Sequence, residues 1–404
     1  MANPGVDPAE LQRTLDVYQQ LGSSERATAK QLGVNRRTVH NRLSRARELG
    51  LTPSGPPAVD ELTALRDEAR VLRATLNSIQ REDITREAVR QKYFGLLDHE
   101  PTPPQWLTKP KPGSGKLGVP TLLASDWHWG ESVSPDEIAN VNEFNLEIAH
   151  DRAKRMVERT IDLLFGRLNN PSYDGLVLAL GGDMVCGTIH EELVANAIPI
   201  MPQVLSLYDA LVGVIDAMLA HFDNLFIPAV TGNHGRTTRK PVAKDRTATN
   251  YDWLTYQLLE RRYRKDKRVV FSIPDGPDCH YRIYNQRYLL THGDQFRGGD
   301  GMIGPLGPIA RGAHKKASRN AALDMDFDTM VCGHFHQLMQ LPSLIVNGSL
   351  KGYDEYAFAG NFRWERPAQG LWITHPTEGI TFQMPVYLDE QRTHDASDWV
   401  SIKQ

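Results

Sequence analysis

The stretch that decides the fold is Gly333-His334-Phe335-His336, which follows the apolar run Met330-Val331-Cys332. A short apolar run before polar residues is typical of a buried strand that ends at a site. Two histidines two positions apart point into one pocket only if the backbone bends between them, and Gly333 has the conformational freedom for such a bend. Alone this pattern is weak evidence, because a histidine pair is more often structural or surface-exposed.

Four more polar clusters lie upstream, each at the end of a short apolar run. They are Ser125-Asp126-Trp127-His128, Gly181-Gly182-Asp183, Thr231-Gly232-Asn233-His234 and Thr291-His292-Gly293-Asp294. Oxygen and imidazole ligands together suit borderline divalent ions such as Mn, Fe, Zn or Co. Since no thiolate joins the set, the pattern excludes a structural zinc finger. Five strand-end clusters in series therefore predict one metal site.

In this order, the motifs D-x-H, G-D, G-N-H, H-G-D and G-H-x-H resemble the calcineurin-like metallophosphoesterase superfamily, over residues 118 to 390. The resemblance implies an α/β fold, a four-layer α/β/β/α sandwich, with two divalent metal ions at the strand ends. We expect Mn first, with Fe, Zn or Co as alternatives. The metal ligands that it implies are Asp126, His128 and His336 for one ion, Asn233, His292 and His334 for the other, and Asp183 as the bridge.

The resemblance also gives His234 a catalytic role, on the leaving group or on the transition-state oxygens. The sequence departs from the family pattern after G-N-H, where Gly235-Arg236 stands in place of a frequent acidic residue. That departure affects the orientation of His234 and the local charge, while the ligand positions are complete.

Residues 1–52 have the pattern of three short helices. Asp7-Pro8-Ala9-Glu10 is a helix start, a second helix is expected from Ser24 to Leu32, and Asn35 can cap a third that runs to about Leu49. The turn between the last two helices resembles the helix-turn-helix domains of DNA-binding regulators and recombinases.

Charge supports DNA binding by this domain, because seven basic residues and no acidic one lie between Arg26 and Arg47. The expected DNA contacts open the third helix, where a recognition helix enters the major groove. They are Arg36, Arg37, Thr38, His40, Asn41 and Arg42. The alternative is a small helical docking domain with a solvated basic face.

The segment between the two domains has two parts. Residues 58–97 carry an apolar heptad seam from Leu62 to Ile79, which predicts either a dimerising coiled coil or one helix packed against its own chain. Residues 98–118 contain five prolines and a K-P-K-P-G-S-G-K run, and they predict a linker. We expect the catalytic domain to span 119–390 and the tail 391–404 to fray.

Basic residues near the metal clusters predict an anionic substrate. Arg236, Arg239 and Lys240 follow His234, where they would hold flanking phosphates; a solvated surface loop is the alternative. His190 would contact substrate or cap a helix. The stretch 297–308 is too rich in Gly and Pro for a helix or strand, and it predicts a mobile substrate flap or a dimer contact.

Composition sets the compartment that we expect. The 404 residues are 40% hydrophobic and 24% charged, and the three cysteines are scattered, which favours a reducing cytosol over a disulfide framework. No apolar run approaches the ~18 residues that span a bilayer, and the N-terminus has no signal-peptide pattern. We expect a cytoplasmic protein without a membrane partner, in a bacterial or phage-infected cell; joining these two domains is reminiscent of bacteriophage genomes.

The favoured interpretation is a metal-dependent DNA phosphodiesterase, that is, a nuclease, brought to its substrate by the helix-turn-helix domain. One alternative is a phosphatase or phosphodiesterase on a protein or small molecule, with the N-terminal domain as a tether. The other is a non-enzymatic DNA-binding regulator, which the complete set of ligand positions disfavours. Three basic segments favour DNA as the partner.

Overall fold

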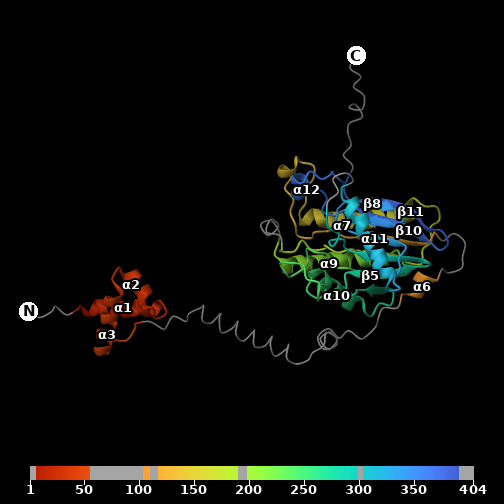
Figure 1. Cartoon of the computed structure of the whole chain (residues 1–404). Helices are drawn as coiled ribbons and strands as arrows, with labels where there is room; N and C mark the ends of the chain where they lie inside the picture. Colours follow the sequence, from red (N-terminus) through yellow and green to blue (C-terminus); the bar gives the residue numbers. More distant parts are fainter. Residues whose placement is uncertain (1–5, 55–102, 110–116, 190–197, 299–303, 391–404) are drawn as a thin grey trace, which may run out of the picture. The chain divides into compact units, whose positions relative to one another are not determined.

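A computed structural model describes residues 6–54, 103–109, 117–189, 198–298 and 304–390 (Figure 1). The chain divides into two compact units, Met1–Asp98 and His99–Gln404. Several sequence predictions lie outside the described residues. They are the heptad helix and proposed dimer contact at 58–97, the substrate contact at His190, and the tail 391–404.

The N-terminal unit is a three-helix domain, as the sequence predicts. Its helices are α1 (Pro8–Gln20), α2 (Glu25–Leu32) and α3 (Arg36–Glu48). The side chains of Asp7, Ser24 and Asn35 cap them, each by accepting a hydrogen bond from a backbone N–H in the first turn. Val39 and Leu43 of α3 pack into the small core between the helices.

The C-terminal unit is built on two β-sheets. The first has the strand order β11-β10-β1-β2-β3-β4, and the second has the order β5-β6-β7-β9-β8. The first comprises β1 (Val119–Ala124), β2 (Leu176–Leu180), β3 (Leu225–Pro228), β4 (Val269–Ser272), β10 (Ala368–His375) and β11 (Gly379–Tyr387). The second comprises β5 (Asp278–Ile283), β6 (Gln286–Thr291), β7 (Thr329–Cys332), β8 (Met339–Leu341) and β9 (Leu344–Val346).

The strand directions explain why the polar clusters meet. β1 to β4 pair in parallel, and so do β6, β7 and β9. β1, β2 and β3 are buried along their full length, which suits strands covered on both faces. Each of the five polar clusters follows the C-terminal end of one of these parallel strands. Because parallel strands end at the same edge of a sheet, the clusters of each sheet lie together at that edge.

Helices cover the outer face of each sheet, which gives the expected four layers (Figure 1). The helices packed on the first sheet are α7 (Leu146–Ile161), α9 (Ile200–Leu219) and α10 (Tyr251–Tyr263). The second sheet is covered by α11 (Leu306–Ala321), whose Ile309 packs on Met330. A third core lies between the sheets, with Phe226 from one sheet and Val331 from the other.

Two segments differ from the sequence-based expectation. The sequence predicts neither helix nor strand for the stretch 297–308, but α11 begins inside it, at Leu306. The helix tolerates Pro308 because this residue lies in the first turn, where its missing N–H breaks no intrahelical bond. Within the predicted linker 98–118, α6 (Gln105–Thr108) forms a helical turn. Its Leu107 is fully buried, and the Leu107 carbonyl accepts a hydrogen bond from Tyr284 N at 2.8 Å. This part of the segment is therefore docked on the C-terminal unit.

α9 is long and apolar enough to span a membrane by length and composition alone. This corrects the expectation that no segment approaches that length. Leu207, Leu211 and Ile215 of α9 are fully buried and belong to the core that covers the first sheet. We therefore interpret α9 as a core helix.

Candidate metal centre

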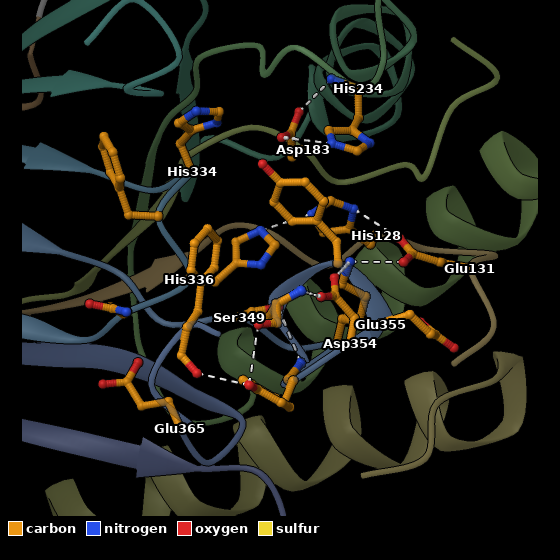
Figure 2. Close-up of a pocket in the computed structure, with 18 of the residues that line it drawn as sticks. His128, Glu131, Asp183, His234, His334, His336, Ser349, Asp354, Glu355 and Glu365 are labelled. Atoms are coloured by element: carbon orange, nitrogen blue, oxygen red, sulfur yellow. Dashed lines mark hydrogen bonds and ion pairs between the residues drawn. The ribbon is translucent and has the colours of Figure 1, made fainter. Parts of the chain in front are cut away.

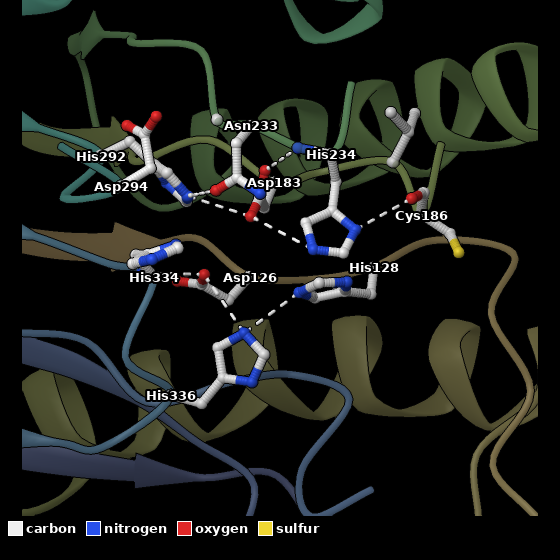
Figure 3. Close-up of polar contacts among 12 residues, drawn as sticks. Asp126, His128, Asp183, Cys186, Asn233, His234, His292, Asp294, His334 and His336 are labelled. Atoms are coloured by element: carbon white, nitrogen blue, oxygen red, sulfur yellow. Dashed lines mark hydrogen bonds and ion pairs between the residues drawn. The ribbon is translucent and has the colours of Figure 1, made fainter. Parts of the chain in front are cut away.

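Seven side chains from five strand ends meet at the edge shared by the two sheets (Figure 3). They are Asp126, His128, Asp183, Asn233, His292, His334 and His336. Two groups of carboxylate and imidazole atoms among them lie within 4.8 Å of one another: one holds Asp126, His128 and His336, and the other holds Asp183, His292 and His334. Both groups can hold a divalent metal ion.

The first group joins β1 to β7. His128 Nε2 lies 3.1 Å from His336 Nε2, and His336 Nε2 lies 3.5 Å from Asp126 Oδ1. Burial lowers the pKa of His128 well below its usual value. Burial thus favours the neutral imidazole, which is the form that binds a metal.

The second group joins β6 and β7 to β2. His292 Nε2 lies 2.9 Å from Asp183 Oδ2 and 3.2 Å from Asn233 Oδ1. His292 Nδ1 lies 2.8 Å from the carbonyl oxygen of Gly181, which orients Nε2 toward the centre. Burial would lower the pKa of His292, but Asp183 raises it to about 10. Burial lowers the pKa of His334 to about 4.

Asp183 lies between the two groups. Its Oδ1 accepts a hydrogen bond from the backbone N–H of His234 at 2.7 Å, while Oδ2 faces His292. Burial would raise the pKa of this carboxyl, but His292 and His234 hold it well below its usual range. The carboxylate therefore stays ionised, with each oxygen directed to a different neighbour.

The backbone at this site is strained. Five candidate ligands have left-handed φ angles: Asp126 (56°), His128 (48°), Asp183 (50°), His334 (70°) and His336 (54°). Such angles are uncommon outside glycine and cluster at functional sites. The bend expected at Gly333 is made by the two histidines themselves. Gly333 instead provides room, because a Cβ at that position would lie 2.3 Å from Asp126 Oδ2.

His234 faces the same centre from the end of β3. Its Nδ1 lies 3.1 Å from the carbonyl oxygen of Cys186, and its Nε2 lies 4.0 Å from Asp183 Oδ2. The ring stands edge-on to His128, with the centroids 4.4 Å apart. The contact with Cys186 thus holds Nε2 on the side of the metal centre (Figure 3).

Sequence reasoning missed several residues that orient the candidate ligands. Ser125 Oγ donates to Asp126 Oδ2 at 2.5 Å, and Asn347 Nδ2 donates to Ser125 Oγ at 2.9 Å. The backbone N–H of His334 donates to Asp126 Oδ1 at 2.9 Å. The G-H-x-H motif marks His334, but no sequence signal marks Asn347.

A chain of buried ion pairs contacts His128 at Nδ1, the ring nitrogen that does not face His336 (Figure 2). Glu131 Oε2 lies 3.1 Å from His128 Nδ1, and Lys351 Nζ lies 2.8 Å from Glu131 Oε1. The same ammonium lies 2.5 Å from Asp354 Oδ2. Burial would lower the pKa of Lys351, but the two carboxylates raise it above its usual value.

A cavity of about 1490 Å³ opens over the candidate ligands. His128, Asp183, His234 and His336 line its base, and Figure 2 shows their rings and carboxylate turned toward it. Arg236 and Arg239 line the cavity from the loop after His234, and acidic, aromatic and basic residues of the segment 352–366 line it as well.

The basic loop after His234 is held by its own backbone. The Arg236 guanidinium donates to the carbonyl oxygens of Asn233, Thr238 and Arg239 at 2.7, 3.1 and 3.3 Å. Arg236 therefore braces the residue that carries a candidate ligand, in addition to lining the cavity. Arg239 lines the cavity and is exposed, and Lys240 is exposed on the same loop.

In the N-terminal unit, acidic residues from neighbouring helices compensate the basic third helix. Glu25 contacts both Arg36 and His40 at 2.9 Å, and Arg42 contacts Glu10 at 2.5 Å. Thr38 Oγ1 donates to the capping oxygen of Asn35. The remaining expected DNA contacts, Arg37 and Asn41, are exposed one helical turn apart.

Comparisons with known proteins give one match to a family model. Residues 11–62 match the family model of the PucR C-terminal helix-turn-helix domain. Curated proteins give no significant match.

Solved structures match the chain at low identity. A predicted phosphoesterase from Streptococcus pneumoniae is 10% identical with a TM-score of 0.24, over 66% of this chain and 97% of that one. A single mutant of Vps29 from Entamoeba histolytica is 11% identical with a TM-score of 0.27, over 66% and 98%. Vacuolar Protein Sorting 29 from Cryptosporidium parvum is 14% identical with a TM-score of 0.26, over 63% and 84%.

Proposed function

We propose that this chain, a helix-turn-helix domain followed by a unit with a metallophosphoesterase fold, is a metal-dependent DNA phosphodiesterase. The main support is the convergence of the seven candidate ligands from both sheets beneath one cavity. Two Asp, one Asn and four His form a mixed oxygen and nitrogen set, which suits two borderline divalent ions. Manganese is the ion that we would test first.

The distances support a division of the ligands between two ions. Asp126, His128 and His336 would hold one, and Asn233, His292 and His334 would hold the other. Asp183 would bridge them, because its atoms approach groups on both sides. Ions bound in this way supply a water of lowered pKa and neutralise charge on phosphoryl oxygens.

The chain's own groups would then handle the leaving oxygen and the rest of the substrate. With Nδ1–H donated to the Cys186 carbonyl, a protonated His234 presents Nε2–H to the cavity and can donate it to the departing sugar oxygen. Arg239, exposed on the cavity wall, is placed to contact a phosphate next to the scissile one.

The helix-turn-helix domain supports DNA as the substrate over a protein or small molecule. Arg37 and Asn41 offer a guanidinium and an amide on the exposed face of α3, and these groups read guanine and adenine edges. A DNA substrate would place the protein in the cytoplasm of a bacterial or phage-infected cell.

The test uses the purified full chain loaded with Mn, and Asp183→Asn as the matched variant. We expect cleavage of circular and linear DNA that EDTA abolishes, and two metal ions per chain by elemental analysis. Asp183→Asn should carry less metal and lose at least about 100-fold in rate, because it weakens both sites.

Two outcomes would reject the nuclease. Hydrolysis of nitrophenyl phosphate without any cleavage of DNA would identify a phosphatase. Full metal loading without hydrolysis of DNA, nitrophenyl phosphate or bis(p-nitrophenyl) phosphate would support the non-enzymatic regulator.

A further inference from the structure

A segment that contributes Tyr356 and Phe362 to the cavity lining carries four exposed aromatic side chains. Tyr356, Phe358, Phe362 and Trp364 are 70%, 44%, 49% and 48% exposed. We call residues 353–366 the aromatic lobe. Four large aromatic residues exposed together within so short a segment are informative, because single exposed apolar residues are common while a cluster beside a cavity marks a binding surface.

The aromatic lobe contains a short helix followed by a turn that folds back on it. It begins with α12 (Glu355–Ala359), and Phe362 N donates back to the carbonyl of Ala357 at 2.8 Å. Tyr353 Oη lies 2.8 Å from the carbonyl oxygen of Phe362. The rings of Tyr356 and Phe362 meet edge-on with their centroids 5.7 Å apart. The rings are thus held in place while a large part of their surface stays in water.

Three side chains connect the aromatic lobe to the metal centre. Asp354 caps α12 through a hydrogen bond from Ala357 N at 2.8 Å, and its other oxygen contacts Lys351. Lys351 contacts Glu131, which lies 3.1 Å from His128 Nδ1. All four members of this chain are buried. The lobe is therefore fixed at a set distance from a candidate ligand.

The charge of the lobe side does not suit phosphate. Glu137, Glu355 and Glu365 line this part of the cavity. Ser134 N donates to Glu355 Oε1 at 2.7 Å, and Leu338 N donates to Glu365 Oε2 at 2.9 Å, so both carboxylates are held. Carboxylates repel phosphate but accept hydrogen bonds from the amino groups of bases. Arg363 and Arg366 also line the cavity from this segment, and Arg366 is paired with Asp389 at 2.7 Å. Arg236 and Arg239 line the cavity from the loop after His234.

We infer that the aromatic lobe is a stacking platform for unpaired bases next to the scissile phosphodiester. The strand's phosphates then follow the arginine side and its bases follow the aromatic side. This inference rests on the proposed function and specifies its substrate as single-stranded or frayed DNA, because bases within a duplex are stacked on each other and cannot offer their faces.

The experiment compares an oligothymidylate with an oligonucleotide of the same length whose central positions lack bases. Stacking is worth ~1–3 kcal/mol per base, so the Mn-loaded wild type should favour the complete strand by about 5- to 100-fold in kcat/KM. In Tyr356→Ala/Phe362→Ala this ratio should fall toward one. Tyr356→Phe and Phe362→Trp should keep it, because they retain a ring.

The matched control is Phe382→Ala. Phe382 is 39% exposed on β11, is not among the described residues that line the cavity, and should leave the ratio unchanged. A wild-type ratio of one, or a ratio that the double alanine variant leaves unchanged, would overturn the platform while the nuclease stands. Preference for duplex over single strands would also overturn it.

A binding measurement separates the platform from cleavage. Trp364 is the most exposed tryptophan among the described residues, so oligothymidylate added with calcium should quench its fluorescence. Trp364→Phe should remove that change, and the abasic strand should produce little of it. If no DNA is cleaved under any condition, the proposed function is wrong. In that case quenching by oligothymidylate would still support the platform, and its absence would reject the platform. Quenching by a protein partner but not by oligothymidylate would reject it.

Discussion

The carboxylate of Asp252 accepts a hydrogen bond from the backbone N–H of Asp183 at 3.0 Å. It also accepts from the N–H groups of Met184, Val185 and Gly232 at 3.2, 3.3 and 3.0 Å. Asp252 lies in the first turn of α10 and is fully buried, and burial raises its pKa to about 6. One side chain thus fixes the segments that follow both β2 and β3.

Replacing Asp252 with alanine should therefore damage both the fold and the metal centre. The variant leaves four buried N–H groups without their acceptor, at ~1–3 kcal/mol each. We expect Asp252→Ala to lower the free energy of unfolding by at least about 3 kcal/mol and to reduce metal content. Asp209→Ala, at an exposed position of α9, should change the stability by no more than about 0.5 kcal/mol. Stability is measured by denaturant titration and metal content by elemental analysis. If Asp252→Ala kept both at the wild-type level, the prediction would be wrong.

His234→Ala should keep both metals while losing turnover on DNA. A sugar alkoxide is a poor leaving group, so loss of the proton donor should slow DNA cleavage by ~10²–10⁴-fold. Nitrophenolate needs little protonation, and the defect on bis(p-nitrophenyl) phosphate should be much smaller. His221→Ala, an exposed histidine after α9, should leave both rates unchanged. Equal slowing on both substrates with metals intact would instead assign the role to charge stabilisation, in which Arg236 could share.

Arg37 and Arg42 should behave differently in DNA binding, although both belong to the third helix. Arg37 is exposed, so Arg37→Ala should weaken binding by about 5- to 100-fold. Arg42 pairs with Glu10 of α1 and its side chain is 18% exposed, so Arg42→Ala should mainly lower the melting temperature of the N-terminal unit. If Arg42→Ala weakened DNA binding more than Arg37→Ala and left the melting temperature unchanged, Arg42 would be a direct DNA contact.

The pH dependence of stability should have a component from Asp278. Lys316 and Arg319 both lie 2.5 Å from its carboxylate. Burial would raise the pKa of Asp278, but these cations hold it below its usual value. Because the folded pKa is lower than the unfolded one, the stabilisation is present above about pH 4 and is lost as pH falls through the folded pKa. Burial also lowers the pKa of Lys316, so the net contribution of the pair is smaller than the shift of Asp278 alone suggests.

Asp278→Asn should therefore be less stable than wild type at pH 7, and the difference should shrink toward pH 3. Denaturant titrations of both proteins at pH 7, 5, 4 and 3 measure this difference, and acid effects common to both cancel. A difference that stays constant across this range would show that the carboxylate charge contributes no stability.

The sequence predicted those features that depend on local chemistry. Asp7, Ser24 and Asn35 mark helix starts because a cap forms within three residues of the side chain. The Glu131–Lys351 pair could not be predicted, because its members are 220 positions apart and meet only through packing. The pairing of the basic third helix with Glu10 and Glu25 could not be predicted for the same reason, since these carboxylates reach it from other helices.

The left-handed backbone at the candidate ligands has an evolutionary consequence. This conformation costs about 1–2 kcal/mol for most non-glycine residues, while glycine adopts it freely. His334, with a φ of 70°, should then fold more stably as His334→Gly than as His334→Ala, although both remove the imidazole. In a lineage whose catalytic activity is no longer under selection, substitution of these residues by glycine would stabilise the fold. Only selection for what the side chains bind would keep aspartate and histidine there.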